Sequence, residues 1–362
     1  MASRNKVALS ALAVLAAATL YLLTWPVPVE PEAWEAPEAP AAEGVWAENQ
    51  ALAEVELLPL PTGEHGPEDL HELGDHVYTG TAGGHILRWA RPEKAGDAVA
   101  PAEQVADTGG RPLGLHADEA GRLLIADADA GLLRLESDGS LTSLCTEAGG
   151  RPLRLADDLD VAADGSVWFT DASARFELER WKHDLLENRG NGRLLRWTAD
   201  GGCEERLAGL HFANGVALAA DDSFVLIVET SRYRVRRLWL TGPRSGEDEV
   251  FIDALPGFPD GISRGPDGHF WIALASPRNP IVDALAGRPF LRKALLRLPD
   301  FMQPAPLRQP YVIEVDEQGQ VLRTLQDLQG RRFGVTTSVQ PCGDRLYLGS
   351  LSEPAAAWLE LD

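Results

Sequence analysis

Four oxygen-bearing side chains stand at equivalent positions of a pattern that repeats along this chain. Each lies about seven residues before a tight turn. Taken at the same place in six successive units, the residues are Glu68, Leu113, Asp157, Asn214, Asp260 and Thr336. Carboxylate and amide oxygens are the hard ligands that calcium prefers in proteins. The four polar positions therefore predict a calcium site, provided that the fold brings them to one axis.

A simpler interpretation exists for any one of these residues. Aspartate and asparagine are common before tight turns because their side chains bond to the turn backbone. That explanation suffices for a single residue. Four such residues in equivalent places, in settings such as the Phe-Pro-Asp-Gly sequence of residues 258–261, favour a shared ring.

The elements that would position these side chains are six short apolar stretches. They are residues 76–80, 122–127, 166–171, 224–230, 269–274 and 345–350. Each is rich in β-branched, aromatic or leucine residues, and most follow a turn such as Asp164-Gly165 or Asp267-Gly268. Strands and turns that repeat every 40 to 50 residues or so are typical of propeller blades. The sequence predicts an all-β, six-bladed β-propeller, in which the same position of every blade faces the central channel.

Two gaps between the repeated stretches are longer than the others. Residues 174–191, between blades three and four, carry Phe176, Leu178, Trp181 and Leu185 at the spacing of a short helix. Residues 279–309, expected between blades five and six, form a second insertion that is apolar in its middle and proline-rich at its flanks. Insertions of this kind often lie over one face of a propeller. We expect them either to form a hydrophobic lid above the calcium or to cover the surface or a partner.

The first twenty-five residues are a separate segment. Arg4 and Lys6 precede an apolar run, residues 7–25, whose length suffices to cross a bilayer as a helix. Positive residues before the run place the amino terminus in the cytoplasm and the body on the extracytoplasmic (periplasmic or lumenal) side. A cleaved signal peptide is the alternative. Pro26 and Pro28 follow Trp25 at once, without a clear small-residue cleavage pattern, so residues 1–25 predict an uncleaved anchor.

The remaining chain divides by composition. Residues 26–49 are rich in proline, alanine and glutamate and predict an extended linker that lifts the body off the membrane. Residues 50–362 are expected to form one closed unit, because a propeller needs all its blades to close.

Composition narrows the function. The chain has 33 basic and 55 acidic residues, a net charge of -22, which argues against nucleic-acid partners. There is no phosphate-binding glycine loop, no Gly-x-Ser-x-Gly elbow and no His-Glu-x-x-His motif, so nucleotide, serine-hydrolase and zinc-protease chemistry are not expected. Three cysteines, Cys145, Cys203 and Cys342, allow at most one disulfide.

Residues 155–171, LADDLDVAADGSVWFTD, resemble the central motif of strictosidine-synthase-like proteins. The similarity continues in order through most of the chain after residue 49. It includes residues 66–69, 110–115, 192–197, 212–218, 228–231, 255–262 and 346–350. The wider group contains gluconolactonase-like and paraoxonase-like enzymes and a membrane-anchored animal relative, all six-bladed propellers. The layout of this chain is similar to that of the anchored member.

The resemblance implies a calcium ion (Ca2+) in the channel, with its ligands falling on Glu68, Asp157, Asn214 and Asp260. The catalytic aspartate of the group falls on Asp260, as nucleophile or as base toward water. The implied reaction is hydrolysis of a small apolar lactone, aryl ester or phosphotriester. Three carboxylates and one amide carry a formal charge of about -3 against the +2 of the ion. Either the excess charge tightens calcium binding, or one carboxylate stays protonated or pairs with a neighbouring group.

This sequence departs from the group at several positions. Asp157 stands where asparagine is usual, and Gly261 stands where asparagine often follows the catalytic aspartate. The proton-shuttling histidine of paraoxonase-like enzymes falls on Leu113, and strand alternation turns nearby His116 to the other face.

The catalytic glutamate of true strictosidine synthases falls on Thr336 or Thr337, so the alkaloid-forming reaction is not expected. The missing base leaves a second hypothesis open: a non-catalytic, calcium-stabilised propeller that binds a ligand or a protein.

Overall fold

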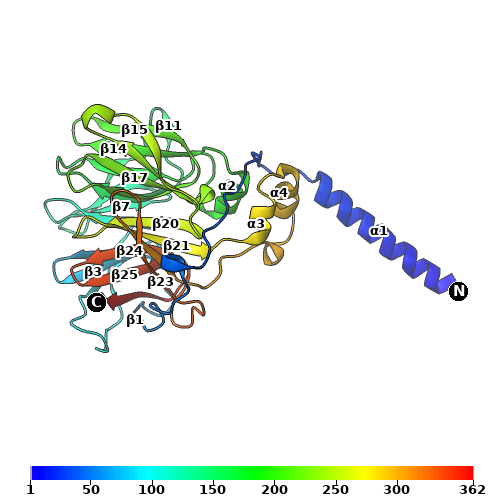
Figure 1. The fold of residues 1–362 in the computed structure, drawn as a ribbon, viewed down its shortest axis with the longest axis horizontal. Coiled ribbons are helices and arrows are strands. Elements are labelled where there is room, and N and C mark those ends of the chain that lie inside the picture. Colours follow the sequence, from blue (N-terminus) through cyan, green and yellow to red (C-terminus); the bar gives the residue numbers. More distant parts are fainter. Residues whose placement is uncertain (1, 362) are drawn as a thin grey trace.

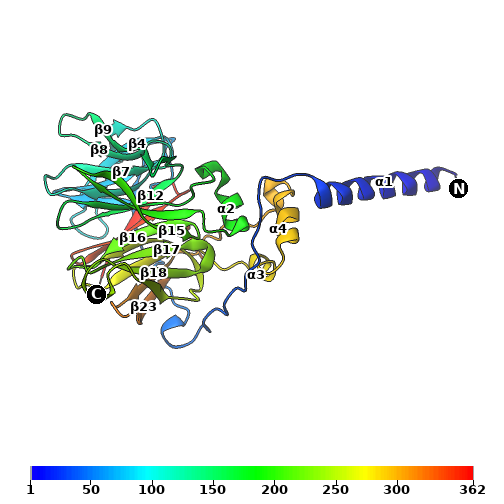
Figure 2. The same ribbon diagram turned by 90° about the horizontal axis from the view of Figure 1, so that it is seen from above.

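Six four-stranded antiparallel sheets surround a central channel in the computed structural model, which describes residues 2–361. Figure 1 shows the sheets as one body, with the helix α1 (Ala2–Thr24) projecting away from it. Seen from above in Figure 2, the insertion helices lie between the sheets and α1. The predicted all-β, six-bladed propeller with a candidate membrane helix is confirmed.

The blades follow one another along the chain, each running from the channel outward. Blade 1 contains β2 (Leu70–Leu73), β3 (His76–Gly80), β4 (His85–Ala90) and β5 (Glu103–Asp107); blade 2 contains β6 (Pro112–Ala117), β7 (Leu123–Asp127), β8 (Gly131–Leu135) and β9 (Leu141–Cys145). Blade 3 contains β12 (Ala156–Val161), β13 (Val167–Asp171), β14 (Gly192–Thr198) and β15 (Gly202–Leu210), preceded by the short hairpin β10 (Glu147–Ala148) and β11 (Arg151–Pro152). Blade 4 contains β16 (Ala213–Leu218), β17 (Phe224–Glu229), β18 (Arg234–Trp239) and β19 (Asp248–Ile252); blade 5 contains β20 (Gly257–Arg264), β21 (Phe270–Pro277), β22 (Tyr311–Val315) and β23 (Val321–Gln326).

Blade 6 joins the two ends of the propeller chain. It contains β24 (Thr336–Cys342), β25 (Arg345–Ser350) and β26 (Ala355–Glu360), and its outer strand is β1 (Glu56–Pro59) from the start of the body. β1 pairs antiparallel with β26, from Glu56 opposite Trp358 to Pro59 opposite Ala355. This pairing ties the first strand of the body to the last and so closes the ring of blades.

The six apolar stretches of the sequence all form the second strand of a blade: β3, β7, β13, β17, β21 and β25. These strands are covered on both faces because adjacent blades pack face to face. Every residue of β17, for example, is buried. Continuous apolar runs, rather than alternating ones, are what this double coverage requires.

Three of these second strands end in an acidic residue. Its carboxylate accepts a hydrogen bond from the backbone just before the innermost strand of the same blade. Asp127, at the end of β7, accepts a hydrogen bond from the backbone amide of Arg111 at 3.1 Å. Asp171, at the end of β13, accepts one from Leu155 at 2.9 Å, and Glu229, at the end of β17, accepts one from His211 at 2.9 Å. In each case the bonded amide lies one or two residues before an innermost strand, so the carboxylate positions the start of that strand.

The two insertions lie within blades, which corrects the expectation that they lie between blades three and four and between blades five and six. Residues 174–191 connect β13 to β14 inside blade 3, with a 3-10 turn (Leu178–Arg180) and the expected helix α2 (Trp181–Glu187). The second insertion connects β21 to β22 inside blade 5, with α3 (Pro280–Ala284), α4 (Pro289–Leu296) and a 3-10 turn (Asp300–Met302). Both leave the end of a second strand, so both rise over the same face of the propeller, where α2 contacts α4.

Residues 26–43 lie along these helices as an extended strap, followed by a 3-10 turn (Gly44–Trp46). The segment is extended, as expected of a linker, but it packs against the body along its length. Val29 is 1% exposed, and the backbone amide of Glu32 donates to the carbonyl of Glu187 at 2.9 Å. A proline-rich extended chain leaves its carbonyls unpaired. Arginine side chains of the body donate hydrogen bonds to these carbonyls. Arg189, for example, donates to the Glu30 carbonyl at 2.6 Å.

A disulfide joins two neighbouring blades. Cys145 at the end of β9 is bonded to Cys203 in β15, with their Cα atoms 6.2 Å apart, while Cys342 is free. The bond links the outer strands of blades 2 and 3, and its two cysteines are 58 residues apart in sequence. Two other turns of 3-10 type, Thr230–Arg232 and Gly242–Arg244, complete the helical elements.

Candidate metal centre

Three of the predicted ligands lie at a break in the pairing of an innermost strand. The register shifts between Ala156 and Leu159 in β12, between Ala213 and Val216 in β16, and between Pro259 and Ile262 in β20. These intervals contain the ligand positions Asp157, Asn214 and Asp260. A bulge re-aims the side chains beside it. Here it brings the three polar groups into the channel.

The residue after a bulged ligand is glycine in two blades, for steric reasons. A Cβ atom at Gly215 would lie 2.5 Å from the backbone nitrogen of Ile262 in the next blade. A Cβ atom at Gly261 would lie 2.7 Å from the carbonyl oxygen of Thr337. The glycine that replaces the usual asparagine at residue 261 therefore permits close approach of blade 6 to blade 5.

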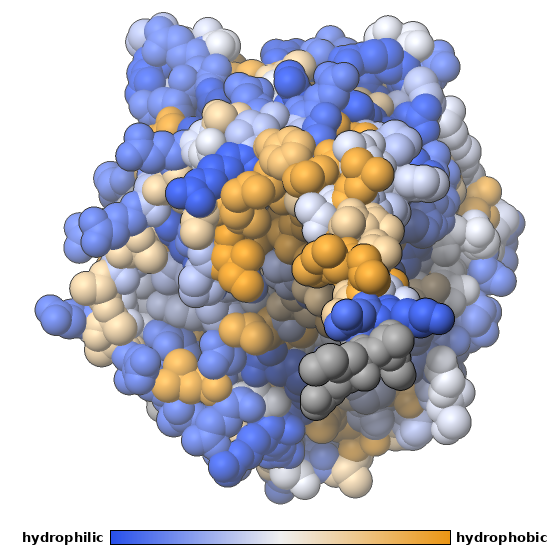
Figure 3. All heavy atoms as spheres, turned by 90° about the vertical axis from the view of Figure 1, so that its right-hand side faces the viewer, coloured by the Kyte–Doolittle hydropathy of each residue, from blue (hydrophilic) through white to orange (hydrophobic). Residues whose placement is uncertain are grey.

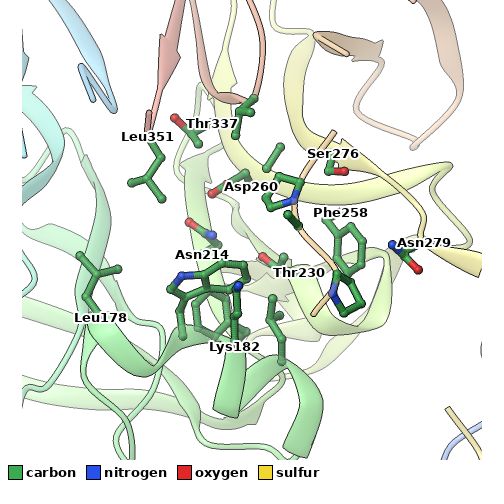
Figure 4. A pocket seen from close by; sticks show the side chains of 18 of the residues that line it. Leu178, Lys182, Asn214, Thr230, Phe258, Asp260, Ser276, Asn279, Thr337 and Leu351 are labelled. Atoms are coloured by element: carbon green, nitrogen blue, oxygen red, sulfur yellow. The ribbon is translucent and has the colours of Figure 1, made fainter. Parts of the chain in front are cut away.

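The structure brings the four predicted ligand residues to one cavity. Glu68, Asp157 and Asn214 are at most 7% exposed, and Asp260 is half-buried. Figure 4 shows Asn214 and Asp260 pointing toward one another across this cavity. Leu113 fills the second position of the ring, as expected. The sixth position belongs to Thr337 rather than Thr336, because the bulge in β24 shifts the inward residue by one place.

The acidic residues next to the ring, Asp69 and Asp158, accept backbone hydrogen bonds that join neighbouring blades. Asp158 accepts hydrogen bonds from the backbone amides of Leu159 at 2.8 Å and Val216 at 2.9 Å, so that both of its oxygens are occupied. Asp69 bonds in the same way to the amides of Leu70 and Leu115, at 2.8 and 2.9 Å. Asp158 thus joins blade 3 to blade 4, and Asp69 joins blade 1 to blade 2. Sequence reasoning did not assign these roles, although each residue forms an acidic pair with a ring residue.

The ring carries excess negative charge. Burial, followed by repulsion from Asp157 and Asp260, raises the pKa of Glu68 well above its ordinary value. Burial and the charge of Asp260 likewise raise the pKa of Asp157, and burial raises that of Asp260 to about 7, against a hydrogen bond from Asn214. Arg111 is the cation that opposes the rise at Glu68 and Asp157. One guanidinium against three carboxylates leaves a site that a divalent cation would stabilise.

These pKa shifts predict how the metal-free protein responds to pH. The pKa of Asp260 rises from an ordinary 3.8 to about 7 on folding, so the folded state holds this proton more tightly. Its stabilising contribution is therefore complete below pH 3.8 and is lost as pH rises through about 7. We expect the melting temperature in EDTA to fall between pH 5 and pH 8. The fall should be smaller in Asp260→Asn, and a slope equal to that of the wild type would contradict the assignment.

The ring separates two cavities of opposite character. Toward the insertions lies the lid pocket, of about 150 Å³, whose walls are mostly apolar. It is lined by Leu113, Leu178, Trp181, Leu185, Phe212, Phe258, Val282, Pro304, Val335 and Leu351. Toward the opposite face lies a polar cavity of about 70 Å³, and Glu68, Asp157, Asn214 and Thr337 border both. Both insertions line the lid pocket, as the lid hypothesis requires.

Two basic residues near the ring lie on different sides of it. His116 borders the polar cavity, away from the lid pocket, as expected from strand alternation. Its Nδ1 lies 2.8 Å from the Ala117 carbonyl, and its Nε2 lies 3.3 Å from Asp160. Lys182 of α2 lines the lid pocket instead, and Figure 4 shows it among the pocket side chains. The position of Lys182 in the wall of this pocket was not predicted from the sequence.

Comparisons with known proteins agree with this architecture. Residues 157–243 match the strictosidine synthase family, and residues 44–89 match the N-terminal family of strictosidine synthase-like proteins. The matches include Glu68, Asp157 and Asn214, whereas Asp260 lies beyond them.

Solved structures with the same fold include a gluconolactonase from Xanthomonas campestris, at a TM-score of 0.61 and 17% identity, covering 92% of this chain and 97% of that one. A calcium-binding protein, regucalcin, from Agrobacterium tumefaciens aligns at a TM-score of 0.55 and 16% identity, covering 84% of this chain and 91% of that one. At these identities the similarity shows the fold alone.

Two relatives are similar along most of their length. The adipocyte plasma membrane-associated protein of Salmo salar is 33% identical over 357 residues, which cover 92% of this chain and 84% of that protein. Protein strictosidine synthase-like 10 of Arabidopsis thaliana is 36% identical over 320 residues, 81% of this chain and 84% of the relative. The chain belongs to the strictosidine synthase-like family.

Proposed function

We propose that this protein is a calcium-dependent hydrolase of lactone, aryl-ester or phosphotriester type, with the ion held by the ring. The observation that carries the proposal is the convergence of three carboxylates and one amide oxygen at the floor of an apolar pocket. Calcium accepts six to eight oxygen ligands in flexible geometry, and waters or substrate would supply the remainder. A gluconolactonase and a calcium-binding protein share this fold, so the architecture is compatible with both the calcium ion and the hydrolysis that we propose.

The residues of the ring divide the chemical work. Glu68, Asp157, Asn214 and Asp260 would hold the ion, which when bound supplies Lewis-acid polarisation of a carbonyl or phosphoryl oxygen. Asp260 would act as nucleophile or as base toward water, and Asn214, as a hydrogen-bond donor to its carboxylate, would orient it. Leu113 offers no second base, so Asp260 is the residue on which turnover depends.

The lid pocket would select the substrate. Its walls come from both insertions and from the inner strands, and they are mostly apolar. Such walls exclude water from the reacting bond and favour a small apolar ester or lactone.

A second candidate function has its own supporting observation. Two of the six ring positions, Leu113 and Thr337, carry no group that titrates near neutral pH. A ring without a separate proton shuttle is also what a non-catalytic, calcium-stabilised binding propeller would have. The two functions differ in whether any ester or lactone is turned over.

The test is a screen of full-length protein against simple lactones, aryl acetates and a phosphotriester, with and without EDTA. The hydrolase predicts turnover that EDTA removes and that calcium restores, whereas magnesium does not. Absence of turnover for every class, in protein that calcium stabilises against heat, would favour the binding propeller.

We also propose that α1 anchors the propeller on the extracytoplasmic side. Residues 5–24 form a helix with a mean hydropathy of 2.1, long and apolar enough to cross a membrane, and the Salmo salar relative is described as membrane-associated. The positive residues in the first turns of the helix, Arg4 and Lys6, and the disulfide both support an outside, oxidising location for the body. Cleavage of the body by a protease added to sealed vesicles of cytoplasmic-side-in orientation would be expected. Full protection there would contradict this orientation.

A further inference from the structure

The second insertion exposes an unusual concentration of large apolar side chains. Phe301 is 86% exposed, Ile281 57% and Met302 56%. The insertion also exposes Phe290, Leu291 and Leu307, at 51%, 38% and 51%. Elsewhere between residues 51 and 361 the large exposed hydrophobics are Val250 and Leu322 alone. Figure 3 views the protein from the side of α1 and shows apolar side chains gathered there, those of α1 itself included. A concentration of this kind marks an interaction surface.

This surface is attached to the end of the apolar helix. Arg297, next to α4 and only 8% exposed, donates from Nε to the carbonyl of Trp25 at 2.5 Å. Its Nη1 donates to the carbonyl of Leu22, in the last turn of α1, at 2.7 Å. The insertion is therefore tied to the point where α1 ends.

The segment that connects α1 to the body is short and is bonded to the body within a few residues of the end of α1. Glu30 is already bonded on both sides of its backbone: its amide donates to Glu187 at 3.2 Å, and its carbonyl accepts from Arg189 at 2.6 Å. Farther along, Arg292 holds both the Leu186 carbonyl of α2 and the Glu32 carbonyl of the strap. These bonds hold α2, α4 and the strap together close to the end of α1.

We propose that residues 280–307 lie in the interface of the bilayer that α1 spans, so that the lid pocket opens at the membrane surface. The apolar part of α1, residues 7–24, is about 27 Å long at roughly 1.5 Å per residue, close to a hydrocarbon thickness of about 30 Å. Trp25, which follows it, therefore lies at the far boundary of the hydrocarbon, and Arg297, which is bonded to the Trp25 carbonyl, lies at the headgroups.

The bilayer fits this surface better than a second protein copy does. Wherever α1 spans a membrane, lipid is necessarily beside the insertion, whereas a partner protein would have to displace it. The apolar residues lie beside the basic residues Arg288 and Lys293, a combination typical of interfacial segments. The net charge of -22 keeps the rest of the body in water.

The consequence for ligands does not depend on hydrolysis. Val282, Gln303 and Pro304 of the same insertion line the lid pocket. A ligand dissolved in the membrane would reach the ring from the bilayer side, and its chemical class is a lipophilic molecule that partitions into lipid. The polar cavity on the other side of the ring remains open to water-soluble species.

The test is to measure lipid contact in full-length protein reconstituted in phosphatidylcholine nanodiscs. A single cysteine replaces Phe301 in a Cys342→Ser background and is labelled with an environment-sensitive fluorophore. The matched control is Asp344→Cys in the same background. Asp344 is 82% exposed in the turn between β24 and β25, at the end of blade 6 away from the lid pocket. Both sites are exposed, so neither change should prevent folding.

We expect the label at residue 301 to emit at shorter wavelength and to be quenched at least about threefold more than the control by lipids that carry a spin label at the interface. Equal quenching at the two sites would overturn the proposal. A blue shift at residue 301 that depends on protein concentration, and not on the spin-labelled lipid, would also overturn it and would indicate contact with a second copy.

Discussion

Asp260→Asn is expected to lower kcat for a lactone or ester by at least about 100-fold at saturating calcium, the lower end of what a general base contributes. The amide keeps an oxygen that can face the ion, but it cannot take a proton from water or attack a carbonyl. Leu113 occupies the ring position where a second base would be, and the ring carboxylates Glu68 and Asp157 would be committed to the ion, so this account leaves no other group to replace the lost carboxylate. Initial rates across a calcium titration measure the effect.

Asp157→Asn is the matched control. It removes a carboxylate from the same ring, and the family resemblance implies asparagine at this position. We expect it to raise the calcium concentration needed for activity while largely preserving kcat once the site is filled. If Asp260→Asn retains more than about a tenth of wild-type kcat, its loss falls outside the range of a general base and the catalytic assignment is wrong.

Arg193→Met is expected to lower the free energy of unfolding by roughly 3–5 kcal/mol, the usual result of breaking a buried ion pair from one side. Arg193 and Asp171 are 1% and 0% exposed, and Nε lies 2.8 Å from Oδ2. The same guanidinium donates to the carbonyls of Pro152 at 2.7 Å and Ala148 at 3.2 Å. Its loss would leave a buried carboxylate next to the strand that carries Asp157. Urea unfolding measures the change.

A surface pair on the same strand provides the comparison. Arg196 in β14 lies 2.7 Å from Asp164, with side chains 26% and 59% exposed. Arg196→Met should cost no more than about 1 kcal/mol, because exposed pairs contribute little. The account of the buried pair fails if the two substitutions destabilise the protein equally. Adding Asp171→Asn to Arg193→Met should recover part of the loss, since the unpaired charge is then gone.

The sequence predicts the fold well because the second strand of each blade is buried on both faces. That burial requires a continuous apolar run, and such a run is visible without a structure. The ring positions follow from the same regularity, because each lies a near-constant distance before a turn. The repeat placed Thr336 at the sixth ring position and the family resemblance left Thr336 or Thr337 open, because the choice depends on a bulge in β24 that no residue type specifies.

The packing of the strap against the body could not be predicted from its composition. Its proline-rich sequence predicts an extended chain, and the chain is extended. Its attachment depends on arginines at positions 189, 278 and 292, which are far away in sequence and meet the strap carbonyls only after the insertions have folded. The same holds for Asp69 and Asp158, whose partners belong to the next blade.

The most direct test of the calcium site is the melting temperature of the full-length protein, in EDTA and across a calcium titration. A ligand that binds only the folded state adds roughly 2.7 kcal/mol at about a hundred times its Kd. We predict a rise in melting temperature that magnesium does not reproduce, and that shifts to higher calcium concentration in Glu68→Gln and Asp157→Asn. No rise with calcium, or a rise of the same size and midpoint in both variants, would contradict a calcium site at this ring.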